Sequence, residues 1–74
     1  MSSTSIQAGG TYQHYKGNVY KVVGVGKIEA TLEDVVVYQG LDHGSPIWVR
    51  PLAEFEEEVE VEGMTVPRFK LLQT

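Results

Sequence analysis

Two stretches that favour β-strands, residues 11–15 and 19–25, flank the turn-forming tripeptide Lys16-Gly17-Asn18. Glycine and asparagine tolerate the positive backbone dihedrals that a tight hairpin turn requires. Along most of the chain the apolar residues recur with a period of two, which is typical of strands, and not with the period of an amphipathic helix. These features predict an all-β fold that contains an early hairpin.

Further elements follow the same pattern. Residues 35–38 are apolar at every position, which is typical of a central strand, and residues 47–50 form the next strand. The segment 51–55 fits one helical turn with Pro51 at its first position. Residues 27–34 could make a helical turn but are too few for an independent helix, so we expect a loop or a continued strand there.

A second hairpin has a predictable register. Residues 58–62 alternate between Glu and Val, and Gly63 supplies the turn. A two-residue loop pairs Val61 with Met64 and Val59 with Val66, so that all four side chains share one face.

Beyond Pro67 the same register would bury Arg68 and expose Phe69. Because proline cannot donate a ladder hydrogen bond, we expect a bulge near Pro67 that turns Phe69 and Leu71 inward. Gly24 and Gly26 likewise predict a bend or bulge near the end of the second strand. Together the elements predict a small, strongly bent, five- or six-stranded SH3-like barrel with one short helical turn.

Length and composition limit the remaining possibilities. A chain of 74 residues forms one small domain, which we expect over residues 9–74 after a flexible leader at 1–8. There is no cysteine for a disulfide or a thiolate metal site. No apolar stretch reaches the roughly 20 residues of a membrane span, and the first residues do not resemble a signal peptide. We therefore expect a cytoplasmic protein.

The formal net charge is −4, and most of the excess acid lies in the second half of the chain. Nonspecific nucleic-acid binding depends on Lys and Arg that neutralise phosphates, so generic duplex nucleic acid is not an expected partner. A reader of single-stranded or modified nucleic acid stays open as an alternative.

The residue types that support catalysis or metal binding are sparse. His14 and His43 are the only histidines, and they lie on different predicted elements without carboxylates at ligand spacing, so no metal site is predicted. No serine lies in a strand-to-helix elbow, and Gly24-Val25-Gly26 lacks the third glycine of a dinucleotide-binding motif. We predict no catalytic residue and no cofactor. His14 is expected to pack on a tyrosine or to cap a loop.

The aromatic residues offer a more specific signal, because they exceed what one small core easily encloses. If Val49 faces the core, Trp48 and Arg50 form an exposed recognition surface. In the opposite parity Trp48 is buried and Arg50 bonds loop carbonyls, and the sequence leaves both arrangements open. The candidate ligand-binding residues are His14, Tyr15, Glu33, Trp48 and Arg50.

Four sequence blocks carry a family resemblance: Gly10-x-Tyr12-x-His14-Tyr15-Lys16-Gly17-x-x-Tyr20, Thr31-x-Glu33-x-x-Val36-Val37-Tyr38, Trp48-Val49-Arg50-Pro51 with Phe55, and Gly63-x-x-Val66-Pro67-Arg68-Phe69. Over residues 9–72 the chain resembles the bacterial family catalogued as domain of unknown function 1653. The resemblance implies no activity, cofactor or catalytic residue. The family pattern has His and Glu where this chain has Ile28 and Ala30, so no site built on that His is expected.

The sequence therefore predicts a small β-barrel binding or accessory module that recognises a peptide, a protein or a small ligand through an aromatic and arginine surface. The alternative is a small enzyme or enzyme-like fragment with a pocket formed by His14, Glu33 and Arg50.

Overall fold

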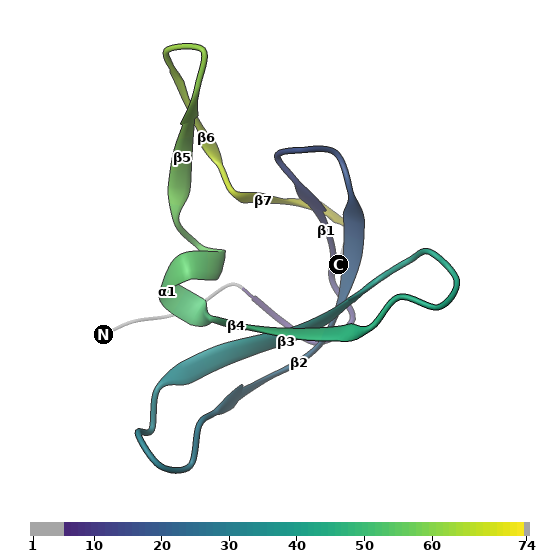
Figure 1. Cartoon of the computed structure of the whole chain (residues 1–74), viewed down its shortest axis with the longest axis vertical. Helices are drawn as coiled ribbons and strands as arrows, with labels where there is room; N and C mark the ends of the chain where they lie inside the picture. The colour runs from purple at the N-terminus through teal and green to yellow at the C-terminus, as the bar shows by residue number, and fades with distance from the viewer. Residues whose placement is uncertain (1–5, 74) are drawn as a thin grey trace.

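The computed structural model describes residues 6–73, which form seven strands and one short helix (Figure 1). In chain order the elements are β1 (Thr11–His14), β2 (Val19–Lys27), β3 (Asp34–Gly40), β4 (Ile47–Pro51), α1 (Leu52–Phe55), β5 (Glu58–Val61), β6 (Met64–Pro67) and β7 (Phe69–Gln73). The all-β prediction is confirmed, with seven strands in the described part of the chain rather than five or six. No helix within residues 6–73 has the length and apolarity to span a bilayer.

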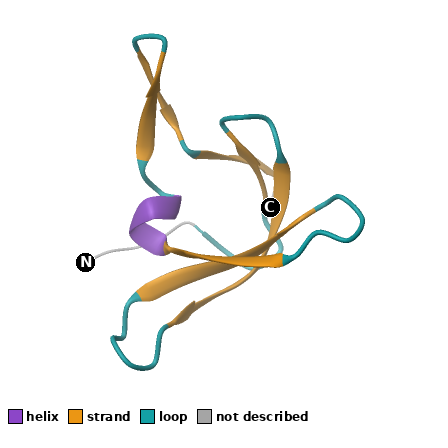
Figure 2. Cartoon of the chain, viewed as in Figure 1, coloured by secondary structure: helices purple, strands orange, loops and turns teal. Residues whose placement is uncertain are grey.

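Five strands form one antiparallel sheet in the order β4-β3-β2-β1-β7, and β5 and β6 form a separate hairpin. The sheet is strongly bent, as predicted, and α1 connects its edge strand β4 to the hairpin (Figure 2). Strands β4 and β7 are the two edges of the sheet and do not pair with each other.

The first hairpin turns where the sequence predicts it. Gly17 has a φ of 114°, and its N–H donates to the carbonyl of His14 at 2.7 Å. In the second strand the β2–β3 register shifts between Val22 and Gly24, which confirms the predicted bulge.

Residues 28–33 form an exposed turn rather than a helix. The N–H of Leu32 donates to the carbonyl of Ile28 at 2.6 Å, and the N–H of Ile28 donates to the carbonyl of Glu33 at 2.9 Å. The expectation of a loop in this segment is confirmed.

The β5–β6 hairpin has the predicted register, with Val59 opposite Val66 and Val61 opposite Met64. Glu62 and Gly63 both have positive φ values, 51° and 82°, as a two-residue hairpin turn of this kind requires.

The chain leaves this hairpin at Arg68 and enters the large sheet as β7. The N–H of Arg68 donates to the carbonyl of Glu57 at 3.0 Å, and its carbonyl accepts from the N–H of Tyr15 at 2.9 Å. This change of sheet, rather than a bulge at Pro67, resets the alternation. Phe69 is buried as predicted. Leu71 lies opposite the buried Tyr12 and so on the predicted core-facing side, but it stays 43% exposed because β7 is an edge strand.

The core is mostly aromatic. Phe55 from α1 stacks on Phe69 from β7 with ring centroids 4.0 Å apart and planes 3° apart. Most other buried members come from the sheet, and the cluster consists of Ile6, Tyr12, Val22, Val36, Tyr38, Phe55 and Phe69. A single residue of a four-residue helix therefore fills the centre of the bent sheet.

Two sequence-based boundaries need correction. Ile6 is only 7% exposed and belongs to the core, so the predicted flexible leader does not extend to residue 8; its remaining residues, 1–5, lie outside the described part of the chain. A lone isoleucine in a polar segment gave no periodic signal. Pro51 is the N-cap of α1 and pairs with Val35 as the last residue of β4, so it is not the first residue of the helix.

Candidate functional site

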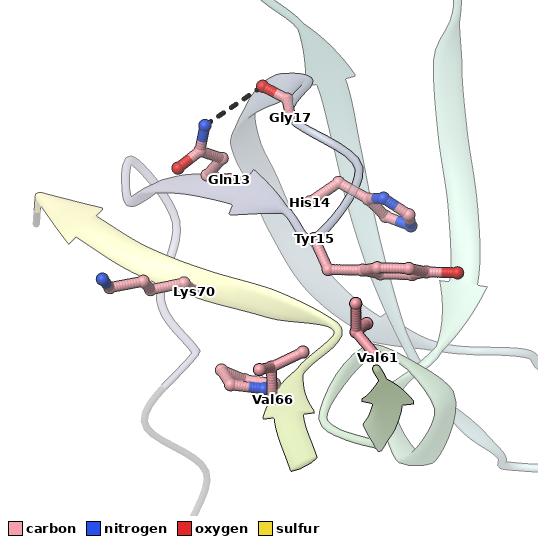
Figure 3. A pocket seen from close by; sticks show the side chains of 8 residues that line it. Gln13, His14, Tyr15, Gly17, Val61, Val66 and Lys70 are labelled. Atoms are coloured by element: carbon pink, nitrogen blue, oxygen red, sulfur yellow. Dashed lines mark hydrogen bonds between the residues drawn. The ribbon is translucent and has the colours of Figure 1, made fainter. Parts of the chain in front are cut away.

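One surface cavity brings together the first turn, the second hairpin and β7 (Figure 3). We name it the His14 cavity, and its volume is about 470 Å³. Its wall consists of Gln13, His14, Tyr15, Gly17, Val61, Val66, Pro67 and Lys70. Cavities of about 300–1,000 Å³ are the usual size for small-molecule sites.

His14 ends β1 and forms part of this wall. Its ring packs against Tyr15 with centroids 4.6 Å apart and against Phe69 at 5.0 Å. Its Nδ1 accepts a hydrogen bond from the backbone N–H of Lys16 at 3.1 Å. Both sequence-based expectations for His14, packing on a tyrosine and capping a loop, are confirmed.

Burial lowers the pKa of the His14 imidazole below its usual range, and nearby positive charges lower it further. Those charges belong to Arg50, Arg68 and Lys16. A lowered pKa favours the neutral ring, and because Nδ1 accepts a hydrogen bond, Nε2 is the nitrogen that can donate.

Positive charge is concentrated around the His14 cavity although the chain is acidic overall. Lys70 lines the cavity, and the ammonium of Lys16 lies 5.8 Å from the centroid of the Tyr15 ring. None of the lining residues is Asp or Glu. Within residues 6–73 no carboxylate forms an ion pair with Lys16 or Lys70. The lining of the cavity therefore carries a positive side chain and no negative one.

Arg50 lies on β4 and is partly enclosed, with 28% of its side chain exposed. Its Nε donates to the Tyr38 hydroxyl at 3.1 Å, and its guanidinium lies 5.6 Å from the centroid of the Phe69 ring. Its Nη1 is 3.6 Å from a carboxylate oxygen of Glu54. Arg50 thus bonds a tyrosine hydroxyl and not the loop carbonyls considered from the sequence.

Strand β4 combines features of both predicted parities. Trp48 lies opposite Tyr38 and therefore on the core-facing side of the sheet, yet it is 48% exposed. Val49 lies on the other face and is 60% exposed, so of the two arrangements that the sequence left open, the one in which Val49 faces the core does not occur. Trp48 is half-exposed although it lies on the core-facing side, because β4 is an edge strand and its side chains are only partly covered on either face.

Of the candidate ligand-binding residues, the structure brings His14, Tyr15 and Arg50 close together and places Glu33 elsewhere. His14 and Tyr15 share the cavity, and Arg50 reaches His14 through the Phe69 ring that both contact. Glu33 ends the turn between β2 and β3 and lines a different cavity with Leu52. The three-residue pocket of the enzyme alternative is therefore not assembled. No group of three or more His, Cys, Asp or Glu residues in the described part of the chain could hold a metal ion.

Sequence reasoning missed the far wall of the cavity, which comes from Val61, Val66, Pro67 and Lys70. The predicted hairpin register already placed Val61 and Val66 on one face. No sequence signal showed that this face meets the first turn, because the contact depends on the change of sheet at Arg68.

Comparison with known proteins agrees with the resemblance found in the sequence. A family profile described as Protein of unknown function (DUF1653) matches residues 10–71. The chain belongs to the DUF1653 family. A crystal structure of a DUF1653 protein from Bordetella bronchiseptica is similar at 34% identity and a TM-score of 0.81, over 93% of this chain and 90% of that chain. A search of curated proteins gives no match.

The two positions at which the resemblance implied a departure from the family lie outside the His14 cavity. Ile28 and Ala30 belong to the exposed turn between β2 and β3. No residue of this turn lines the His14 cavity. In Figure 1 this turn lies at the opposite end of β2 from the first hairpin turn.

Proposed function

We propose that this domain is a non-enzymatic binding module whose His14 cavity takes a small anionic ligand with an apolar body. The observation that carries the proposal is the composition of the cavity wall, where apolar side chains and hydrogen-bond donors meet without a single carboxylate. In a chain with a net charge of −4, such a wall is not expected from composition alone.

The two halves of the wall correspond to two parts of a ligand. Val61, Val66 and Pro67 offer an apolar surface, on which burial of a ligand contributes about 25 cal/mol per Å². Lys70 and the Nε2–H of His14 offer donors, and hydrogen bonds between an ionised acceptor and such donors are among the stronger ones in proteins. A carboxylate attached to an aliphatic or aromatic group matches both halves.

A binding role is also consistent with the lack of an assembled catalytic group. His14 is neutral and already uses Nδ1 in a local hydrogen bond, and Glu33 is not near it. A cytoplasmic location is part of this proposal, and the cysteine-free composition is consistent with it.

The test is an amide NMR titration with three probes that share one body: 4-phenylbutyrate, 4-phenylbutanol and 4-phenylbutylamine. We expect the carboxylate to bind best and to shift the amides of Tyr15, Val66 and Lys70. Lys70→Gln should weaken binding of the carboxylate by roughly tenfold, which corresponds to the loss of one charge-assisted hydrogen bond.

Lys27→Gln is the matched control, because its ammonium pairs with Asp34 at 2.7 Å on the exposed β2–β3 ladder and does not line the cavity. The control variant should bind as the unmodified protein does. Equal binding of the amine and the carboxylate, or equal effects of the two lysine substitutions, would contradict the proposal.

A further inference from the structure

Strand β4 is an edge of the large sheet with an unusually apolar surface. Ile47 is 58% exposed, Trp48 48% and Val49 60%. Within the described chain β4 pairs only with β3, so one side of its backbone has no strand partner. Exposed edge strands of this kind are templates for pairing with another chain unless charges or prolines interrupt them.

The other edge strand of the sheet, β7, is less suited to pairing with another chain. Strand β7 carries Lys70 near its beginning, and a lysine on an edge strand discourages pairing with another chain. In β4 the only charged residue is Arg50, and prolines occur only next to its first residue and at its last, at Pro46 and Pro51. The edge is thus open over a short and well-defined length.

Pro51 also indicates which backbone groups face outward. Along an antiparallel strand, backbone N–H and C=O groups point alternately toward and away from the neighbouring strand. Proline is tolerated in a ladder where its nitrogen faces away from the partner strand. Because Pro51 pairs with Val35, the N–H and C=O groups of residues 47 and 49 and the carbonyl of Pro51 face away from β3.

We propose that β4 pairs antiparallel with β4 of a second copy of this chain, with Val49 at the two-fold axis. This register aligns the segment between the two prolines along its full length and joins the two five-stranded sheets into one. A shift by two residues in either direction would lose part of that length. The interface is isologous, so it closes as a dimer and does not continue into a filament.

The side chains of β4 are self-complementary in this register. Trp48 of each copy lies opposite Arg50 of the other on the core-facing side, so each indole ring packs against the arginine side chain, whose guanidinium is held inward by Tyr38. Val49 packs on its own symmetry mate on the opposite face. The proposal is independent of the His14 cavity, to which β4 contributes no lining residue.

The contact involves two strands of five residues each, so its area is below the standard size of a stable interface. We therefore expect a weak dimer that forms at high protein concentration. Sedimentation equilibrium of the unmodified chain, from micromolar to millimolar concentration, should show a monomer converting to a dimer. A strict monomer at millimolar concentration would overturn the proposal. The partner of the β4 edge would then be an extended peptide of another protein.

Single-cysteine variants test the register, since the chain itself has no cysteine. In Val49→Cys the two thiols of the dimer belong to directly opposite residues, whose Cα atoms are about 5.5 Å apart and so within disulfide range. Ile47→Cys is the matched control, equally exposed and on the same face. Its two thiols would be separated by four residue positions, or about 13 Å along the strand.

Under mild oxidation Val49→Cys should form a covalent dimer at least roughly tenfold faster than Ile47→Cys, because only the first pair lies within disulfide range. Leu72→Cys on β7 serves as a second control, with an exposure of 48%. Equal rates for Val49→Cys and Ile47→Cys, or a faster reaction of Leu72→Cys, would overturn the proposed register.

Discussion

Replacing Arg50 by alanine tests whether this side chain stabilises the fold. The substitution leaves the hydroxyl of Tyr38 without its partner, and Tyr38 is buried. A stranded buried polar group costs about 1–3 kcal/mol, and we expect the lower part of this range because water can enter beside a partly exposed Arg. The lost contact with the Phe69 ring adds about 0.5–1 kcal/mol. The exposed ion pair with Glu54 adds at most about 0.5 kcal/mol.

The expected sum is a loss of about 2–3 kcal/mol in the free energy of unfolding, against a total of about 4–11 kcal/mol for a domain of 74 residues. The corresponding decrease in Tm is roughly 10–20 °C. The assay is urea denaturation together with thermal melting of Arg50→Ala, Tyr38→Phe and the double variant.

The double-mutant cycle isolates the hydrogen bond between the Arg50 Nε and the Tyr38 hydroxyl. We expect a coupling energy of about 1 kcal/mol, because each single substitution breaks the same bond. A loss below about 0.5 kcal/mol for Arg50→Ala would refute the reasoning, since this is the range of surface substitutions without structural roles.

Three further predictions concern titration, packing and metal. Because the folded pKa of His14 is lowered, the unfolded chain binds more protons, and stability should fall as the pH drops from about 6.5 to the folded pKa; His14→Gln should show a smaller loss in pH-dependent melts. Phe69→Ala should cost about 3–5 kcal/mol and leave the domain close to unfolding, as circular dichroism would detect; a melt that changes by only a few degrees would contradict the central role of this ring. Zinc or a chelator should leave the Tm unchanged, whereas a large loss with chelator would reveal an unrecognised metal site.

The parts of the fold that were predictable from sequence are those that depend on neighbouring residues. The turn at Gly17 and the register that pairs Val59 with Val66 follow from local backbone chemistry and from alternation within one hairpin. The face of Leu71 was predictable in the same way, but its burial was not, because the exposure of an edge strand depends on what lies beside it.

In the candidate site, too, only the features that depend on neighbouring residues were predictable from the sequence. His14 and Tyr15 are adjacent in the chain, so their shared role could be anticipated. The contribution of Lys70 and Val66 depends on contacts between distant segments, which carry no signal in the spacing of residues. The mixed environment of Trp48, on the core-facing side yet half-exposed, arises because β4 has no strand beyond it.

The pairing of β1 with β7 has a consequence for how the chain folds. These strands lie near opposite ends of the described sequence, so Tyr12 meets Leu71 only when nearly the whole described chain closes into a loop. Phe69, which stacks on Phe55 at the centre of the core, also belongs to this last strand. Contacts between such distant residues slow folding, since loop closure must precede the stabilising contact. During synthesis, the domain therefore stays without its core until β7 has left the ribosome.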